Sequence, residues 1–276
     1  MSNFASLRTE STNQQTKDID KLDALGIAKA INEQDKTVAE AVEQALLQVA
    51  EGIELYADIL KKGGRVFYVG AGTSGRLGVL DASECPPTYG VSAETVQGII
   101  AGGKDAAFDS IEDAEDDPES IVRQLKAKDF NEKDLCIGLS ASGSAMCVQG
   151  AMKYARSIGA RTMCVSCNAD SALIPLSDVA IIAVVGAEVI NGSTRMKAGT
   201  AQKMILNMLS TGGMIRTGRV RGNYMAYMVP SNKKLVDRAI RIICSETGCE
   251  SETAKEYLEK HEYSIADAID DINSIK

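Results

Sequence analysis

Five short apolar runs follow one another along the chain, and segments with a helical pattern separate them. The runs cover residues 65–70, 95–102, 135–142, 162–168 and 179–186. The segments 143–158 and 193–217 carry apolar residues at helical spacing. Strands that alternate with helices are typical of βαβ units, in which helices cover both faces of a parallel sheet. The pattern therefore predicts an α/β fold, a three-layer doubly wound parallel five-stranded sheet with right-handed crossovers.

Both ends of the chain depart from this alternation. Residues 1–34 are polar and show little periodicity, so we expect an arm that becomes ordered against a partner. Three short helices without intervening strands are predicted towards the C-terminus, at 232–247, 251–260 and 264–273. The predicted division is an N-terminal arm at 1–34, an α/β domain at 35–230 and a small C-terminal three-helix module at 231–276.

Between the arm and the first run, a helix is expected to begin at Thr37. This residue forms a capping box with Glu40 and precedes apolar residues at helical spacing. Gly63 and Gly64 are expected to end the helix, because glycine readily takes the left-handed conformation found just past helix ends.

Composition narrows the classes of partner. The 276 residues carry a net charge of −8, which argues against non-specific binding to nucleic acid or to anionic membranes, although local donors can still hold an anionic substrate. No apolar run is long enough to span a membrane, and the first twenty residues lack the apolar core of a signal peptide. Seven cysteines, an odd number, suit reduced thiols better than a disulfide framework. We therefore expect a cytoplasmic protein.

Candidate chemistry lies in the loop that follows the first run. Residues 70–75 match the G-x-G-x-x-G pattern of dinucleotide-binding loops. Such a fold also needs an acidic residue about 20 positions further on, but Asp105 comes only after a Gly-Gly turn. Gly72, Thr73 and Ser74 instead offer backbone N–H groups and hydroxyls to a single phosphate at a helix start. We favour a monophosphate site, with a dinucleotide site and a purely structural glycine turn as alternatives.

Two further strand-to-helix turns are rich in hydroxyls. The second follows the third run and contains Ser140, Ser142, Gly143 and Ser144. The third follows the fifth run and contains Glu188, Ser193, Thr194, Arg195 and Lys197. Arginine can bind two phosphate oxygens at once and lysine serves as a point charge. A serine-rich helix cap and solvated basic side chains are the plainer alternatives. Because ligands bind at the carboxyl edge of an open parallel sheet, we expect Thr73, Ser74, Ser142, Ser193 and Thr194 to converge on one anion-sized pocket.

Two glutamates are candidates for acid–base chemistry. Glu84 lies beside Cys85-Pro86-Pro87, and the prolines are expected to end the helix that the first loop opens. Glu115 lies in the acidic run 112–117, most of which we expect to be solvated or to cap the next helix. Spacing alone gives Glu115 little support as a catalytic residue.

Other catalytic constellations find no support. The single histidine, His261, falls in the predicted helical module, so a Ser-His-Asp or Cys-His mechanism lacks a base near the loops. Cys164 and Cys167 have the spacing of a redox motif but lie in a predicted strand. We predict no metal site and no cofactor.

With these residues identified, the chain closely resembles the N-acetylmuramic acid 6-phosphate etherases. The longest matching stretches are GAGTSGRLGVLDASECPPT at 70–88 and VVGAEVINGSTRMKAGTAQKMILNMLSTG at 184–212. Shorter ones are LRTESTNQQTKDIDKLDAL at 7–25, the EDAEDD run, SCN at 166–168 and LVDRAIRIICSETGC at 235–249. The resemblance covers nearly the whole chain.

The resemblance implies a sugar-isomerase (SIS) domain, a homodimer with sites near the subunit interface, and a terminal module similar to a ubiquitin-associated three-helix bundle. It also implies cleavage of the D-lactyl ether of a sugar phosphate to N-acetylglucosamine 6-phosphate and D-lactate, in cell-wall amino-sugar recycling or catabolism. The family's two catalytic carboxylates fall, by motif, on Glu84 and Glu115. One carboxylate would remove the C2 proton of the open-chain sugar and a carboxylic acid would protonate the departing lactate.

One segment departs from the family pattern. The second hydroxyl-rich turn usually continues Ser-Gly-Arg-Thr-Pro-Tyr, but here Ser142-Gly143 is followed by Ser144-Ala145-Met146-Cys147. An arginine and a threonine hydroxyl are thus missing, and RGNYMAYMVPSN at 221–232 also departs. A non-catalytic sugar-phosphate sensor related to glucokinase-regulatory proteins and an aldose–ketose isomerase on the same fold are the alternative interpretations.

Overall fold

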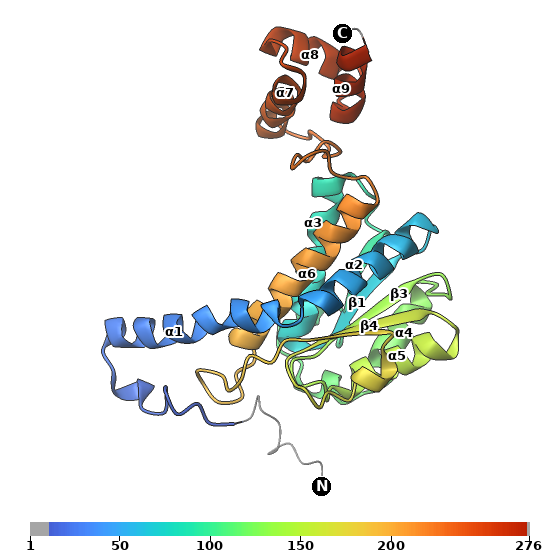
Figure 1. Cartoon of the computed structure of the whole chain (residues 1–276). Helices are drawn as coiled ribbons and strands as arrows, with labels where there is room; N and C mark the ends of the chain where they lie inside the picture. The colour runs from blue at the N-terminus through green and yellow to red at the C-terminus, as the bar shows by residue number, and fades with distance from the viewer. Residues whose placement is uncertain (1–10, 275–276) are drawn as a thin grey trace. The chain divides into compact units, whose positions relative to one another are not determined.

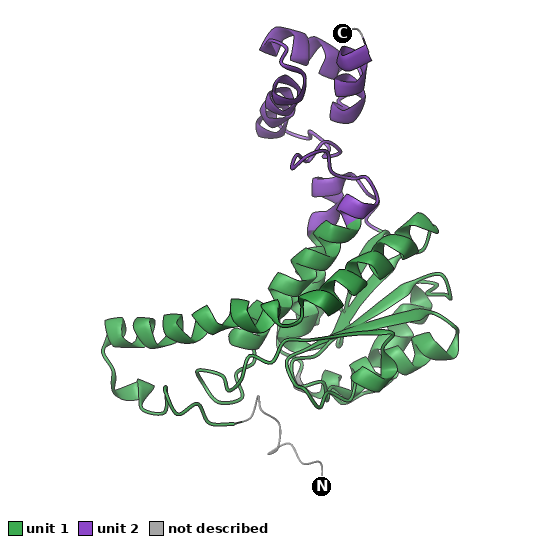
Figure 2. Ribbon diagram, in the orientation of Figure 1, with its two compact units in different colours: residues 1–83, 94–213 green, residues 84–93, 214–276 purple. Residues whose placement is uncertain are grey.

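The computed structural model describes residues 11–274, apart from the side chain of Glu112 (Figure 1). The chain divides into two compact units, coloured separately in Figure 2. Unit 1 comprises residues 1–83 and 94–213, and unit 2 comprises residues 84–93 and 214–276. The predicted division at residues 34 and 230 differs from these boundaries and stays a prediction.

Unit 1 is built on one sheet of five parallel strands. The strands are β1 (Val66–Gly70), β2 (Val96–Ile100), β3 (Leu135–Leu139), β4 (Arg161–Ser166) and β5 (Val179–Ile182). Their order is β2-β1-β3-β4-β5, so the direction of winding reverses between β1 and β3. Every residue of β1 and β3 is buried, as expected for central strands that helices cover on both faces. The predicted fold class is confirmed.

Helices pack on both faces of this sheet (Figure 1). These helices are α2 (Leu46–Lys61), α3 (Gly72–Tyr89), α4 (Ser120–Ala127), α5 (Met146–Ser157) and α6 (Lys197–Arg216). Helix α1 (Ala24–Glu43) comes before them and projects away from the sheet (Figure 1). Short 3₁₀ turns are η3 (Ile19–Lys21), η4 (Lys104–Ala107), η5 (Glu112–Glu115) and η6 (Ile174–Leu176). Phe67 and Val69 of β1 join the core under α4 and α5. Tyr68, between them, points to the opposite face, where its hydroxyl meets Asp81 of α3. Because successive side chains of β1 point to opposite faces, the strand contributes residues to the packing on both sides of the sheet.

The first helix begins earlier than predicted. The carboxylate of Asp23 accepts a hydrogen bond from the backbone N–H of Gly26 and caps α1, so the helix already runs through the predicted arm. Thr37 lies inside α1, and its hydroxyl donates to the carbonyl of Gln34 at 2.8 Å. The predicted start at Thr37 was therefore wrong. A hydroxyl that bonds back into its own helix does not cap it.

The prolines after Glu84 do not end α3. The helix continues through Pro86 and Pro87 to Tyr89, contrary to the prediction. Each proline removes one backbone donor, but both fall in the last turn, where few hydrogen bonds remain to be lost. The N–H of Gly90 still donates to the carbonyl of Pro86 at 3.0 Å, and the positive φ of Gly90 (63°) then ends the helix.

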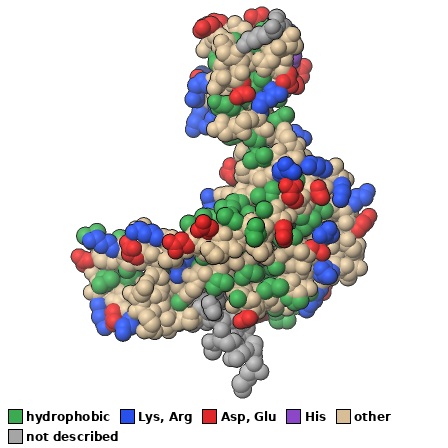
Figure 3. Space-filling view, viewed as in Figure 1, with side chains coloured by type: hydrophobic (Ala, Val, Ile, Leu, Met, Phe, Trp, Pro, Cys, Tyr) green, Lys and Arg blue, Asp and Glu red, His purple; other side chains and the backbone are tan. Residues whose placement is uncertain are grey.

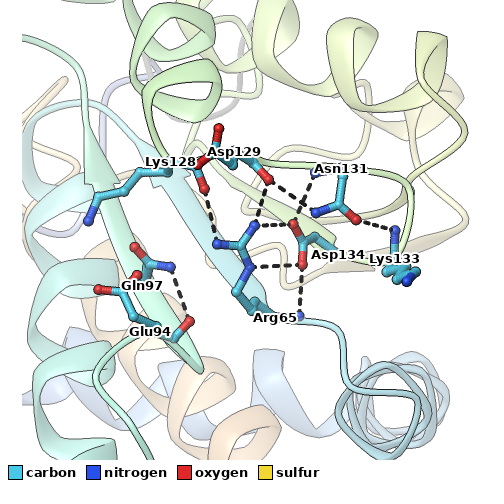
Figure 4. Close-up of polar contacts among 8 residues, drawn as sticks. All are labelled: Arg65, Glu94, Gln97, Lys128, Asp129, Asn131, Lys133 and Asp134. Atoms are coloured by element: carbon cyan, nitrogen blue, oxygen red, sulfur yellow. Dashed lines mark hydrogen bonds and ion pairs between the residues drawn. The ribbon is translucent and has the colours of Figure 1, made fainter.

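A buried ion pair joins the amino ends of β1 and β3 (Figure 4). Asp134 accepts from the side chain of Arg65 at 2.7 and 3.1 Å and from its backbone N–H at 2.9 Å. The guanidinium also donates to the carbonyls of Lys128 and Asp129. Hydrogen bonding to Asp134 raises the pKa of Arg65 above its usual value. This cluster fixes one end of the central strand pair.

Unit 2 contains the three predicted C-terminal helices, α7 (Lys233–Thr247), α8 (Ser251–Lys260) and α9 (Ile265–Ser274). The side chain of Asn232 caps α7, and Gly248 ends it with a φ of 70°. Ile243, Leu258 and Ile269 are buried in a core of their own. Within residues 11–274, no helix has the length and apolar character needed to cross a lipid bilayer.

Candidate active site

A hydroxyl-rich pocket opens at the carboxyl ends of β1 and β3, where the strand order reverses. Its volume is about 270 Å³. The hydroxyls that line it come from Ser74, Ser140, Ser142, Ser144 and Thr194, and Glu115 adds a carboxyl group. No lysine or arginine of the described chain contributes to the lining. The pocket can therefore offer hydroxyls and the backbone groups of its loops to an anion.

The first loop holds Ser74 in the pocket through close backbone packing. A Cβ added at Gly75 would lie 2.8 Å from the carbonyl oxygen of Gly70, so only glycine allows helix α3 to start so close to the end of β1. Gly72 opens the helix with a φ of 50°. Ser74 is buried, whereas Thr73 lies beside Gly199 of α6 and is not among the lining residues.

The second loop depends on Gly143. Its φ of 77° is left-handed, and an added Cβ would come within 2.0 Å of the Ser171 hydroxyl oxygen. The Gly143 N–H donates to the hydroxyl oxygen of Ser140 at 3.0 Å. The hydroxyls of Ser142 and Ser144 bond to each other at 2.7 Å. The loop is thus held by its own hydroxyls, of which those of Ser142 and Ser144 can turn towards a ligand.

The third segment divides its predicted site residues between two locations. Thr194 lines the pocket, but Ser193 and Arg195 do not. Both carboxylate oxygens of Glu188 accept backbone hydrogen bonds at 2.9 Å, from Lys197 and Ala198, and so cap helix α6. A phosphate contact by Glu188 stays a prediction.

Lys197 is buried next to this cap, and its ammonium group donates to the side chain of Gln34 in α1 at 3.3 Å. Burial lowers the pKa of Lys197, and the charges of Glu188 and Asp35 oppose that shift. Lys197 does not line the pocket. Phosphate binding by Lys197, Ser193 and Arg195 also stays a prediction.

Glu115 combines a position in the pocket with a perturbed acidity. It ends the 3₁₀ turn η5 and, like Glu84, is exposed as a residue, but desolvation by the protein around its carboxyl group raises the pKa of that group, with a further contribution from the charge of Asp116. A carboxyl group whose pKa rises towards neutrality suits proton transfer at the pH of a cell. Glu84 lies on the segment of α3 that belongs to unit 2, and its side chain is exposed. The catalytic roles of both glutamates stay predictions.

Sequence reasoning missed two buried polar residues near the pocket. Asp81 on α3 accepts hydrogen bonds from Tyr68, Asn207 and Ser210, and burial raises the pKa of its carboxyl group. Gln202 on α6 accepts a hydrogen bond from the Ser74 hydroxyl at 2.9 Å. A signal for Asp81 existed, because it follows Ser74 by seven residues and so shares its face of the helix. The sequence holds no comparable signal for Gln202.

The described residues hold no group of three or more histidine, cysteine, aspartate or glutamate side chains arranged to bind a metal ion. No disulfide bond is found among the cysteines in the part of the chain that the structure describes.

The parallel sheet and its hydroxyl-lined pocket place the chain among proteins with a SIS domain, and a SIS domain model matches residues 113–212. A model of the glucokinase regulatory protein N-terminal SIS domain matches residues 48–156. A solved protein of E. coli CFT073, in complex with A5P, shares the fold with a TM-score of 0.53 and 15% identity, over 73% of this chain and 97% of its own.

Two curated relatives are much more similar. Both are named N-acetylmuramic acid 6-phosphate etherase. The protein from Clostridium beijerinckii is 52% identical over 97% of this chain and 88% of its own length. The protein from Photorhabdus laumondii is 50% identical over 93% of this chain and 85% of its own length. The chain belongs to the N-acetylmuramic acid 6-phosphate etherase family.

Proposed function

We propose that this chain is a carbon–oxygen lyase that cleaves the D-lactyl ether of N-acetylmuramic acid 6-phosphate, giving N-acetylglucosamine 6-phosphate and D-lactate. The observation that carries the proposal is 52% identity over 97% of the chain to a relative named for this reaction. The pocket supports it, because hydroxyl-rich loops that start α3 and precede α5 are suited to a sugar phosphate.

In this proposal the reaction is an elimination followed by addition of water. The C2 proton of the open-chain aldehyde is acidified by the neighbouring carbonyl, and the C3 ether oxygen leaves as lactate. One of Glu84 and Glu115 accepts the C2 proton, and a protonated carboxyl group delivers a proton to the leaving oxygen. The raised pKa of Glu115 fits either role. Water then adds at C3 and restores the saturated sugar.

A sensor that binds sugar phosphate without turnover is the second candidate, and the match of residues 48–156 to a regulatory SIS domain is the observation behind it. That match covers less of the chain than the etherase relatives do. Glu115 in the pocket also suits catalysis better than sensing. The etherase is therefore the better-supported function.

A single assay separates the candidates. Purified protein is incubated with N-acetylmuramic acid 6-phosphate, and D-lactate is measured with a coupled dehydrogenase while NMR follows the sugar. We expect equimolar D-lactate and N-acetylglucosamine 6-phosphate, with and without prior treatment with a chelator. Binding without lactate release would support the sensor, and conversion of an aldose phosphate to a ketose phosphate would support an isomerase. Loss of activity on chelation would reveal a metal requirement.

We also propose that the protein is a cytoplasmic homodimer. Hydrophobic side chains lie at the surface of the larger unit (Figure 3). Leu25 of α1, Leu47 of α2 and Leu80 of α3 are 62%, 78% and 52% exposed. The homodimer is what the resemblance to the family implies, and these side chains are candidates for burial between two subunits. The seven free thiols suit a reducing compartment. Sedimentation analysis at micromolar concentration should give twice the chain mass of 29.3 kDa; the chain mass itself would contradict the dimer.

A further inference from the structure

Ser74 is engaged in a way that does not suit an anion. Its hydroxyl lines the pocket but donates its only proton to the Oε1 atom of Gln202, at 2.9 Å. The oxygens of a phosphate dianion only accept hydrogen bonds, so a phosphate in the pocket needs that proton. As long as the Ser74 hydroxyl donates to Gln202, Ser74 presents only lone pairs to the ligand.

The amide of Gln202 is itself incompletely satisfied. The side chain is 1% exposed, and its Nε2 group is buried with no hydrogen-bond partner in the part of the chain that the structure describes. A buried donor without a partner costs about 1–3 kcal/mol. The two ends of a glutamine amide are nearly equal in shape but opposite in hydrogen-bonding character. A half-turn of the amide would therefore bring Nε2 to the Ser74 oxygen without displacing other groups.

We propose that Gln202 is a positioning residue that switches the Ser74 hydroxyl towards phosphate. When a phosphate enters, the amide turns over and Nε2 donates a hydrogen bond to the Ser74 oxygen. The Ser74 hydroxyl, which keeps its proton, then donates its hydrogen bond to a phosphate oxygen. One hydrogen bond thus becomes a chain of two, in which each bond strengthens the other. The unpaired donor of Gln202 is replaced by an unpaired acceptor. This inference rests on the proposed role of the pocket as a phosphate site.

The surrounding contacts allow the amide to move while the helices stay in place. Two turns beyond Ser74 on α3, Asp81 accepts hydrogen bonds from Asn207 and Ser210 of α6, at 2.8 and 3.2 Å. Near the start of α6, Gly199 lies beside Thr73 of α3. Helices α3 and α6 are thus held on both sides of the Ser74–Gln202 pair. The response to a ligand is confined to a side-chain rotation.

The test is a double-mutant cycle on binding, which does not depend on turnover. Isothermal titration of the full chain with N-acetylglucosamine 6-phosphate gives Kd for the wild type, Gln202→Met, Ser74→Ala and the double variant. Ser74→Ala loses one hydrogen bond to phosphate, which predicts a Kd roughly 3- to 10-fold weaker. Gln202→Met loses the donor that orients the Ser74 hydroxyl towards phosphate, so its Kd should also be weaker, but by a smaller factor. Because both residues act through the same proton, the double variant should bind within about 2-fold of Ser74→Ala. Titration with N-acetylglucosamine should show no such pattern.

Two further variants serve as a control and as a second test. Gln97→Met is the matched control, because Gln97 is also buried, donates through Nε2 to the carbonyl of Glu94, and does not line the pocket. Its Kd should stay within about 2-fold of the wild type. Gln202→Glu keeps the shape of the side chain, and at pH 8 its carboxylate can only accept, so it holds the Ser74 proton. Because its negative charge also repels phosphate, its effect is read from a cycle with Ser74→Ala: the weakening should be clearly smaller in the Ser74→Ala background, and this cycle provides the measurement if Gln202→Met does not fold.

Three outcomes would overturn the inference: unchanged binding by both Gln202 variants, a double variant as weak as the product of the two single effects, or an equal effect on the unphosphorylated sugar. The outcomes that would refute the proposed function differ from these three. A wild type that binds the sugar phosphate but releases no lactate would refute the etherase and leave the role of Gln202 open to this same cycle. A wild type that binds no sugar phosphate would refute the phosphate pocket itself.

Discussion

Strands β1 and β3 run side by side over five residue pairs, from Val66 and Leu135 to Gly70 and Leu139, yet their two ends are built differently. At the amino ends, Arg65 and Asp134 form an ion pair in which Asp134 is almost fully buried and hydrogen bonds occupy both partners. At the carboxyl ends, the pocket is lined by neutral hydroxyls with one carboxyl group, Glu115.

The difference separates stability from binding within one strand pair. A buried ion pair with every partner in place tolerates no rearrangement, because any lost partner leaves a desolvated charge. Hydroxyls can rotate and serve as donor or acceptor, so they can exchange bonds within the loop for bonds to a ligand. The amino ends fix the register of the strands, and the carboxyl ends can respond to what enters the pocket.

The largest effect is expected at the amino ends. Asp134→Ala leaves the guanidinium of Arg65 and two backbone N–H groups without their acceptor. We predict a loss of roughly 3–5 kcal/mol in the free energy of unfolding, measured by urea denaturation. Asp237→Ala, which removes an exposed ion pair with Arg241, should cost less than about 1 kcal/mol. Similar losses of unfolding free energy for Asp134→Ala and Asp237→Ala would show that the ion pair at the amino ends stabilises the fold no more than an exposed pair does.

The second prediction concerns a variant at the carboxyl ends, Glu115→Gln, that should change activity but hardly change stability. Glu115→Gln keeps the shape of the side chain but removes the group that transfers a proton. We predict that lactate release falls roughly 10²-fold or more, with a change of less than about 1 kcal/mol in the free energy of unfolding. Lactate release near the wild-type rate would show that Glu115 is not catalytic.

Glu84→Gln provides the comparison for this variant. It should lose lactate release to a similar degree. It should also lose exchange of the C2 proton with solvent deuterium, measured by NMR, if Glu84 accepts that proton. Exchange that persists in Glu84→Gln and disappears in Glu115→Gln would instead identify Glu115 as the group that accepts the C2 proton.

The third prediction tests how rigidly the second loop is built. Gly143→Ala combines a left-handed backbone with a clash against Ser171. Gly63→Ala is a matched control, because Gly63 has the same φ of 77° but nothing within 4 Å of an added Cβ. We expect Gly63→Ala to cost about 1 kcal/mol and Gly143→Ala at least about 1–2 kcal/mol more. Equal losses of unfolding free energy for Gly143→Ala and Gly63→Ala, measured by urea denaturation, would show that the second loop rearranges at little cost.

The smallest expected effect concerns the charge beside Glu115. Asp116 raises the pKa of Glu115, so Asp116→Asn should lower that pKa. The limb of the kcat/KM profile that reports Glu115 should then move to lower pH, and only part of the shift should be removed, because burial is its larger cause. A limb that stays in place or moves to higher pH would assign it to another group.

Much of this architecture could be predicted from the sequence, because the five apolar runs and the glycine-rich turns carry strong local signals. Ser74, Ser142 and Thr194 meet in one pocket because parallel strands end at a common edge. The start of α1 was misplaced because Thr37 and Glu40 imitate a cap, while the functioning cap, Asp23, lies in a stretch with little periodicity. The end of α3 was misplaced because both prolines fall in the last turn, where few backbone hydrogen bonds remain to be lost. Gln202 could not be found, because its role depends on a contact 128 residues away in sequence.

The cap that Glu188 places on α6 has a consequence for the protein without its ligand. A helix start is an electropositive site that draws in ions from solution when nothing covers it. Here the carboxylate of Glu188 occupies that position permanently from inside the chain. The protein thus carries its own counter-ion at one of its three hydroxyl-rich strand-to-helix turns, and the start of that helix is capped whether phosphate is abundant or scarce. Folding of this part of the molecule is therefore independent of the metabolic supply of the ligand.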